Sequence, residues 1–234
     1  MKQIRVYLPH ESQPCSYLPQ QRSRSLYVDP HLKLDQQELS LLSQNGFRRS
    51  GRVVYRPECP SCNACQSVRI QAQQLTLSRS HRRILKKNRD LTLKVELPVD
   101  GALHYPTYKR YINERHSDGD MYPPHFEQYQ GFLLEDFGNT RFLSAYLGEK
   151  LIGSLVFDVL DDGLSSVYCF FEPEHSERSP AMFLILSLTI LAHGLKLPFN
   201  YLGYQVDGCQ KMAYKTRFSP LDAFINDEWR PKLR

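Results

Sequence analysis

The most apolar stretch of the chain, Ala181–Leu197, constrains the fold more than any other segment. Polar residues interrupt this stretch at four positions, Ser187, Thr189, His193 and Lys196. A bilayer span needs roughly 20 predominantly apolar residues, so the segment is marginal for crossing a membrane. We therefore expect a helix buried inside a globular protein. Pro180 stands directly before it, and proline suits the first turn of a helix.

Segments with strand patterns surround this helix. TRFLSAYLG, KLIGSLVFDVL and LSSVYCFFEPE precede it, and FNYLGYQV and a helical QKMAYKTRF follow. Gly148 with Glu149, and Asp161 with Asp162 and Gly163, predict hairpin turns between the first three. This order matches a GNAT-like acyltransferase, in which two neighbouring strands splay apart and expose backbone groups that hold an acyl donor.

The predicted fold class is therefore mixed α+β, with two domains. An alternating strand, LTLKVEL, ends at Pro98 and supplies the best boundary. We expect an N-terminal, cysteine-containing domain at residues 1–97 and a GNAT-like acyltransferase domain at residues 98–234.

Three cysteines stand at CxxCxxC spacing in YRPECPSCNACQSVR. Two intervening residues let successive thiolates face one ion, so Cys59, Cys62 and Cys65 are predicted metal ligands, and Cys15 can complete a tetrahedral set. The spacing does not choose between structural zinc and an iron-sulfur cluster. The alternative is that these thiols are merely neighbours. Cys169 and Cys209 are expected to pack as small apolar side chains.

Arginines are concentrated just before the cysteines, in GFRRSGRVVYRP. Arg48, Arg49 and Arg56 are candidates for binding an anion, phosphate or carboxylate, because a guanidinium group binds both in a bidentate manner. They equally fit a solvated basic edge, or a set of charges that neutralises nearby thiolates.

A second basic segment, TLSRSHRRILKKNRDLTLK, carries seven Lys or Arg residues against one Asp. Ser78 or Ser80 can cap a helix that continues to Asn88. Its basic residues are then spread around much of the helix, which suits a nucleic-acid backbone as well as a solvated face. The candidate nucleic-acid-binding residues are Arg79, Arg82, Arg83, Lys86, Lys87 and Arg89.

The segment that follows is rich in aromatic residues. Tyr105, Tyr108 and Tyr111 have helical spacing, which indicates a core-facing stripe. A loop then carries two His and two Asp residues, but their irregular spacing argues against a metal site.

The amino terminus, MKQIRVYLPHESQP, lacks the apolar run of a signal peptide. We therefore expect a cytoplasmic protein with reduced or metal-bound thiols and no membrane association. The net charge of +5 is small, so the local basic segments carry more information than the total.

Several motifs in order along the chain carry a family resemblance: PCSYLP, GFRRSG, RPECPSCNACQSVRI, RSHRRILKKNRDL and YLGYQVDGCQKMAYKTRFSPLDAF. They resemble the bacterial aminoacyl-tRNA protein transferases, most closely the aspartate/glutamate leucyltransferase branch. The resemblance implies transfer of leucine from leucyl-tRNA to the amino terminus of proteins that begin with Asp or Glu, which marks them for the N-degron pathway of protein degradation.

The chain departs from the family pattern at three places. Arg178, Ser179, Pro180 and Ala181 stand where the family has Arg-Ser-Leu-Gly, and Gln205 stands where Trp is common. The cysteine pair of the eukaryotic arginyl branch is reduced to Cys15, with Leu18 in the second place. These changes affect the expected donor contacts and cluster chemistry, and leave the expected fold unchanged.

The implied reaction is direct aminolysis of an activated ester, which needs no acyl-enzyme and no cofactor for the chemistry. The acceptor α-amino group has a pKa near about 8, so a weak base or water is sufficient. The candidate catalytic residues are Tyr168 and Tyr204, as proton donors to the departing ribose hydroxyl, and Lys211 and Lys215, which lie four residues apart and would share one face of an α-helix. Arg48, Arg49 and Arg56 are the candidate binding site for the acidic N-terminal residue.

Three alternatives remain open from the sequence. The donor could be arginyl-tRNA. A coenzyme-A acetyltransferase would share the fold, but HSERSPAMF lacks the glycine-rich loop that binds pyrophosphate. A non-catalytic, metal-stapled RNA-binding module would share the cysteines and the basic helix. The oligomeric state is not predicted.

Overall fold

The computed structural model describes residues 3–135 and 137–232 of the chain. Eleven helical segments and fourteen strands form these two ranges. The α-helices are α1 (Gln36–Gln44), α2 (Arg79–Lys87), α3 (Pro98–Gly101), α4 (Tyr105–Arg115), α5 (Phe126–Tyr129) and α6 (Pro180–Gly194). The 3₁₀ helices are η1 (Ala72–Gln74), η2 (Ala102–His104), η4 (Pro173–Arg178) and η5 (Gln210–Arg217), and η3 (Gln130–Leu134) is a short π-helix.

A small antiparallel sheet forms the amino-terminal part of the molecule. Its strand order is β1-β4-β6-β5. The strands are β1 (Val6–Tyr7), β4 (Ser25–Val28), β5 (Arg48–Ser50) and β6 (Val53–Pro57), and a separate pair is formed by β2 (Gln13–Pro14) and β3 (Arg22–Ser23). Helix α1 joins β4 to β5, and Asp35 and Glu38 cap its first turn reciprocally.

The large sheet has eight strands in the order β14-β13-β7-β12-β11-β10-β9-β8. They are β7 (Cys65–Gln71), β8 (Thr92–Glu96), β9 (Thr140–Leu147), β10 (Lys150–Leu160), β11 (Gly163–Phe171), β12 (Phe199–Val206), β13 (Leu221–Ile225) and β14 (Glu228–Pro231). All neighbouring pairs are antiparallel except β11 and β12, which α6 connects as a parallel crossover.

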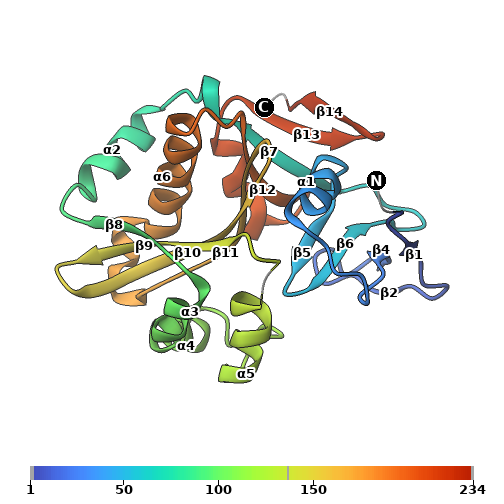
Figure 1. Ribbon diagram of the computed structural model, residues 1–234, viewed down its shortest axis with the longest axis horizontal. Coiled ribbons are helices and arrows are strands. Elements are labelled where there is room, and N and C mark those ends of the chain that lie inside the picture. The colour runs from blue at the N-terminus through green and yellow to red at the C-terminus, as the bar shows by residue number, and fades with distance from the viewer. Residues whose placement is uncertain (1–2, 136, 233–234) are drawn as a thin grey trace.

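Helices cover both faces of the large sheet (Figure 1). On one face, α6 packs its apolar surface on strands β9 to β12, and α2 lies outside α6. On the other face, α4 and the α5–η3 segment bury Tyr108, Ile112, Tyr129 and Leu133 against the sheet. The predicted buried helix and the predicted tyrosine stripe are confirmed, and the fold class is the predicted mixed α+β.

The sheets do not separate at the predicted boundary, residue 97. Strands β7 and β8 come from the first 97 residues, yet both belong to the large sheet, and β7 lies between β12 and β13. One core also combines Val28, Leu39 and Val54 with Leu160 and Tyr201. The alternating segment before Pro98 was read as the end of a domain, whereas it is the edge strand of the large sheet.

Candidate functional site

The parallel strands β11 and β12 separate from each other part-way along their length. They pair only between Gly163–Ser165 and Phe199–Tyr201. Beyond these residues both strands continue, to Phe171 and Val206, without pairing to each other. The splay predicted from the order of elements is therefore present, and it leaves backbone N–H and C=O groups of the two strands available to a ligand.

Each of the two strands carries a β-bulge where the separation begins. On β11, Tyr168 pairs with Val156 and Ser166 with Phe157, so Val167 is the extra residue. On β12, Tyr201 pairs with Arg69 and Gly203 with Val68, so Leu202 is the extra residue. A bulge bends its strand, and two bulges facing each other give the splay a local cause.

Arg48 lies in this splay. Strand β5 of the small sheet carries it, and its guanidinium donates to the carbonyl of Leu202 at 3.1 Å and to the carbonyl of Val167. Gly203, in a left-handed conformation with φ of 71°, leaves the space for this side chain, since a Cβ there would overlap the guanidinium. Gly203 was not foreseen as a site residue, although a glycine inside a strand pattern indicates a bulge or a close approach of another group.

Lys215 is buried beside Arg48. Only 5% of it is exposed, and its ammonium group donates to the carbonyl of Tyr204 on β12. Burial, and secondarily the Arg48 charge, hold the pKa of Lys215 well below the ordinary lysine value. Among the described residues no carboxylate pairs with Arg48 or Lys215. This end of the splay therefore holds the Arg48 cation beside a lysine whose neutral amine form is favoured.

Lys211 lies apart from Lys215. Segment η5 is a 3₁₀ helix, with about three residues per turn, so side chains four positions apart point in different directions. Lys211 is exposed and forms an ion pair with Asp118 at 3.3 Å. The prediction that both lysines share one helix face is wrong, because it assumed the periodicity of an α-helix.

The two candidate tyrosines differ in their surroundings. The hydroxyl of Tyr204 is within hydrogen-bond distance of the carbonyls of Gly46 at 3.1 Å and Tyr55 at 2.9 Å, inside the contact between the two sheets. This placement argues against Tyr204 as a proton donor to a substrate. Tyr168 packs against Phe132 and Tyr108, and burial raises its pKa far above the ordinary value, so it keeps its proton.

Two of the three arginines proposed for substrate binding already have carboxylate partners. Arg49 is 4% exposed and binds Asp158 of β10 through two hydrogen bonds of 2.6 and 2.7 Å. Arg56 pairs with Asp227 at 3.0 Å and with Glu58 at 3.6 Å on the surface. These partners leave Arg48 as the cation of the three without a described carboxylate.

The four candidate metal ligands line one cavity of about 160 Å³. Its wall also contains Tyr17, Tyr55, Tyr204 and two arginines, Arg22 and Arg24, and no Asp or Glu. The backbone N–H groups of Tyr17 and Leu18 donate to Cys15 Sγ at 3.4 Å, which is a typical environment for a thiolate ligand. Burial and the neighbouring thiols raise the pKa of Cys65 to about 12.

The donor chemistry of this cavity fits zinc or an iron-sulfur cluster, but its side chains are not arranged as a ligand set. Within the described residues no three His, Cys, Asp or Glu side chains are placed to hold one metal ion. A bound ion would have to draw the thiols together, and the metal site stays a prediction. Cys169 packs in the main core as expected, whereas Cys209 is one of the thiols around Cys65.

The basic segment forms the helix that the sequence predicts. Ser78 caps α2 at its first turn, and the helix ends before Asn88. His81, Ile84 and Leu85 pack inward, where the His81 ring lies 5.5 Å from that of Phe218. The six candidate tRNA-binding residues are all exposed: Arg79, Arg82, Arg83, Lys86, Lys87 and Arg89.

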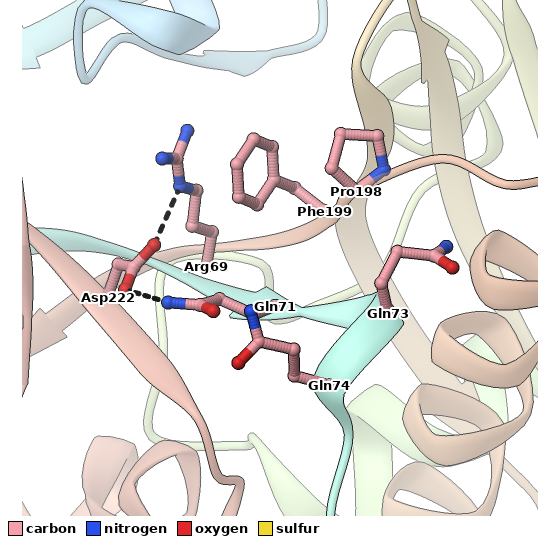
Figure 2. A pocket seen from close by; sticks show the side chains of 7 residues that line it. All are labelled: Arg69, Gln71, Gln73, Gln74, Pro198, Phe199 and Asp222. Atoms are coloured by element: carbon pink, nitrogen blue, oxygen red, sulfur yellow. Dashed lines mark hydrogen bonds and ion pairs between the residues drawn. The ribbon is translucent and has the colours of Figure 1, made fainter.

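A second cavity, of about 310 Å³, was not foreseen from the sequence. Figure 2 shows Arg69 and Gln71 converging on Asp222, with distances of 3.3 and 2.7 Å, beside the ring of Phe199. The guanidinium carbon of Arg69 lies 3.4 Å from the centroid of that ring. This cavity is at the end of β12 where β11 and β12 still pair, so it is separate from the splay.

Comparison with known families gives two matches that together cover most of the chain. The family model described as "Arginine-tRNA-protein transferase, N terminus" matches residues 13–83, and "Arginine-tRNA-protein transferase, C terminus" matches residues 103–225. No helix within residues 3–135 and 137–232 is long and apolar enough to cross a bilayer.

Curated proteins named aspartate/glutamate leucyltransferase are similar over nearly the whole chain. The protein of Marinobacter nauticus is 45% identical over 95% of this chain and 92% of its own length. That of Saccharophagus degradans is 42% identical, with 94% and 93% covered, and that of Teredinibacter turnerae is 43% identical, with 98% and 94% covered.

Solved structures show weaker similarity. A crystal structure of FemX has a TM-score of 0.46 at 7% identity, covering 88% of this chain and 81% of that chain. The C-terminal domain of a lysylphosphatidylglycerol synthetase from Agrobacterium fabrum has a TM-score of 0.44 at 12% identity, covering 72% and 51%.

Proposed function

The chain belongs to the arginine-tRNA-protein transferase family, and from this membership we propose that it transfers leucine from leucyl-tRNA to the amino terminus of proteins that begin with Asp or Glu. Relatives above 40% identity over nearly their full length support this donor and these acceptors. The reaction takes place where aminoacyl-tRNA is used, in the cytoplasm, and directs its products to N-degron degradation.

The observation that carries the proposal is the splay between β11 and β12, with Arg48 and Lys215 at its base. The acceptor α-amino nitrogen attacks the carbonyl carbon of the leucyl ester, forming the new C–N bond. The C–O bond to the terminal ribose breaks, and the proton lost by the amine is balanced by the one gained by the ribose oxygen. Unpaired N–H groups along the splay stabilise the intermediate oxyanion.

Two side chains are suited to the proton movements. Tyr168 lies on β11 directly after its bulge and keeps its proton at neutral pH, so its hydroxyl can donate a hydrogen bond to the departing ribose oxygen while that oxygen takes up its proton. Lys215, whose pKa is lowered, can accept the proton of the attacking amine. Lys211, on the surface beside Asp118, is better placed to contact the incoming tRNA.

Recognition of an acidic residue requires a cation that the protein has not already neutralised. Arg24 lines the cysteine cavity, makes one described hydrogen bond, from Nε to the carbonyl of Glu58 at 3.3 Å, and has no described carboxylate partner. The cavity shares Tyr55 and Tyr204 with the surroundings of Arg48. The carboxylate of the acidic residue binds Arg24 at the wall of this cavity, while the space between the four cysteines is left to the metal.

Replacement of Arg24 tests this assignment. Arg24→Ala is expected to raise the KM for peptides that begin with Asp or Glu by roughly 10- to 100-fold, the effect of losing a charge-assisted hydrogen bond. Arg56→Ala, whose guanidinium already has two carboxylate partners, is the matched control and should leave KM unchanged. Equal effects of the two replacements would contradict the role of Arg24.

Helix α2, with its five exposed basic residues, and Arg89 just after it bind the tRNA backbone. We propose that Cys15, Cys59, Cys62 and Cys65 would be drawn together around a zinc ion or an iron-sulfur cluster, which they would hold as thiolates. Such a group would staple β2, β3 and the segment before β7 together and would take no part in the chemistry. Elemental analysis of the purified protein tests this: Cys59→Ser and Cys62→Ser should lose metal, whereas Cys169→Ala, in the core, should retain it.

The function itself is tested by mass spectrometry of peptides beginning with Asp, Glu, Lys or Arg, after incubation with the protein and either leucyl- or arginyl-tRNA. Addition of leucine to the Asp and Glu peptides alone is expected. Addition of arginine instead would change the donor. Tight tRNA binding without transfer to any peptide would overturn the enzyme assignment in favour of an RNA-binding module.

A further inference from the structure

The two bulges at the base of the splay meet at a single side chain. Val167 and Leu202, the extra residues of β11 and β12, each direct a carbonyl toward Arg48. The two strands do not pair with each other at these residues. The Arg48 guanidinium therefore takes the place of a backbone ladder at the position where the ladder ends.

The surroundings of Arg48 are unusual for an arginine, because its guanidinium binds two backbone carbonyls and has no described carboxylate partner. Its charge also lies close enough to buried Lys215 to disfavour a proton on that lysine. By contrast, the next residue, Arg49, is paired with Asp158. A fold that only needed to join the small sheet to the large one would already have that join through Arg49.

The opposite strand is shaped to receive this side chain. Gly203 follows the β12 bulge with a positive φ, and any Cβ at this position would overlap the Arg48 guanidinium. Gly203 thus meets two requirements at once, the left-handed backbone and the space for Arg48. Gly203 on β12 therefore has to be a glycine because β5 places Arg48 against it.

We propose that Arg48 is a positioning residue that sets the separation of β11 and β12, and so aims their unpaired backbone groups at the reacting ester. This inference rests on the proposed function. It assigns Arg48 to the geometry of the splay and separates it from binding of the acidic acceptor residue. It also gives the small sheet a role in the reaction, since β5 carries Arg48. We call the contact of Arg48 with the carbonyls of Val167 and Leu202 the clamp.

Two replacements test the clamp, one on β5 and one on β12. Arg48→Lys keeps a positive charge but cannot hold two carbonyls with one planar group. Gly203→Ala leaves Arg48 unchanged chemically and displaces it by overlap. The matched control is Gly148→Ala, because Gly148 also has a positive φ, of 59°, and a Cβ there meets nothing within 4 Å.

The first readout is steady-state leucine transfer to a peptide that begins with Asp. Both replacements should lower kcat by about 10- to 100-fold, the effect expected of a misplacement of roughly 1 Å, with KM for the peptide unchanged. Gly148→Ala should retain wild-type kcat. A rise in KM with unchanged kcat, or loss of preference for Asp over Lys peptides, would overturn the proposal by making Arg48 a substrate-binding residue.

The second readout needs no substrate. Hydrogen exchange of the folded protein should show faster exchange of amides in β11 and β12 beyond the bulges for Arg48→Lys and Gly203→Ala, and not for Gly148→Ala. Unchanged exchange in these strands would contradict the clamp. If the wild-type protein transfers no leucine, the proposed function fails, while this measurement still decides whether Arg48 holds the strands.

Discussion

Adjacent residues in one short strand have different tasks. Arg48 binds two backbone carbonyls in the splay, whereas Arg49 lies in a buried network with Asp158 and Thr140. Thr140 donates in turn to Asp158 at 2.6 Å. Sequence reasoning grouped these arginines with Arg56 because residue type and spacing do not reveal whether a carboxylate 109 positions away will be a partner.

Breaking the Arg49–Asp158 pair should destabilise the protein strongly. Arg49→Met or Asp158→Leu leaves the other charge buried and unpaired, so the free energy of unfolding should fall by about 3–5 kcal/mol. The double replacement should lose less than either single one, because it leaves no unpaired charge. Chemical denaturation measures these values, and Arg230→Ala, at an exposed arginine, should change stability by less than about 1 kcal/mol.

The buried Lys215 should give the protein a specific pH dependence. Its pKa in the folded state is lowered, so between that value and the ordinary lysine pKa the unfolded chain binds a proton that the folded chain does not. Stability therefore rises with pH across this window. Lys215→Met removes this contribution. The free energy of unfolding of the variant minus that of wild type should therefore be largest at the acidic end of the window and should decrease as the pH rises. Urea denaturation of both proteins between pH 6 and 9 measures it, and a constant difference would contradict it.

At the scale of elements, capping and periodicity were sufficient for several predictions. Ser78 caps α2 as expected, and the apolar run forms α6. The prediction for η5 failed because its eight residues form a 3₁₀ helix, and nothing in QKMAYKTRF distinguishes that periodicity from an α-helix over two turns. The bulges in β11 and β12 were missed because they depend on partners distant in sequence.

The exposed face of α2 should act on tRNA binding without acting on stability. Arg83→Glu should weaken tRNA binding and make the dependence of the affinity on salt shallower by about one unit of slope. The control is Arg230→Glu, an equal change of charge at an exposed arginine of β14. Filter binding at several salt concentrations gives the slopes, and indistinguishable slopes for the two variants would argue against α2 as the binding surface.

At the scale of the whole molecule, the strands β9 to β12 of the large sheet could be predicted from the sequence. It was insufficient for β7 and β8, which precede the predicted boundary at residue 97. The pairing of β7 with β12 and β13 joins residues more than a hundred positions apart, and no local pattern encodes it.

Division of the chain at that boundary should therefore fail to give two folded parts. Residues 98–234 alone would lack β7, and their core would lose Val68, Ile70 and Ala72, all fully buried. We expect each part alone to show non-cooperative thermal unfolding by circular dichroism, in contrast to the intact chain. A cooperative transition in the 98–234 fragment would show that β7 is dispensable.

The position of β7 also sets the order in which the protein can mature during translation. A ribosome releases β7 early, but the two strands that flank it, β12 and β13, are synthesised only near the end of the chain. Until then β7 has unpaired edges and an apolar face with no sheet around it. The nascent chain thus exposes an apolar, unpaired strand through most of its synthesis, which makes it a target for chaperones that hold unfolded chains. The splay between β11 and β12 forms only after the last strands have joined the sheet.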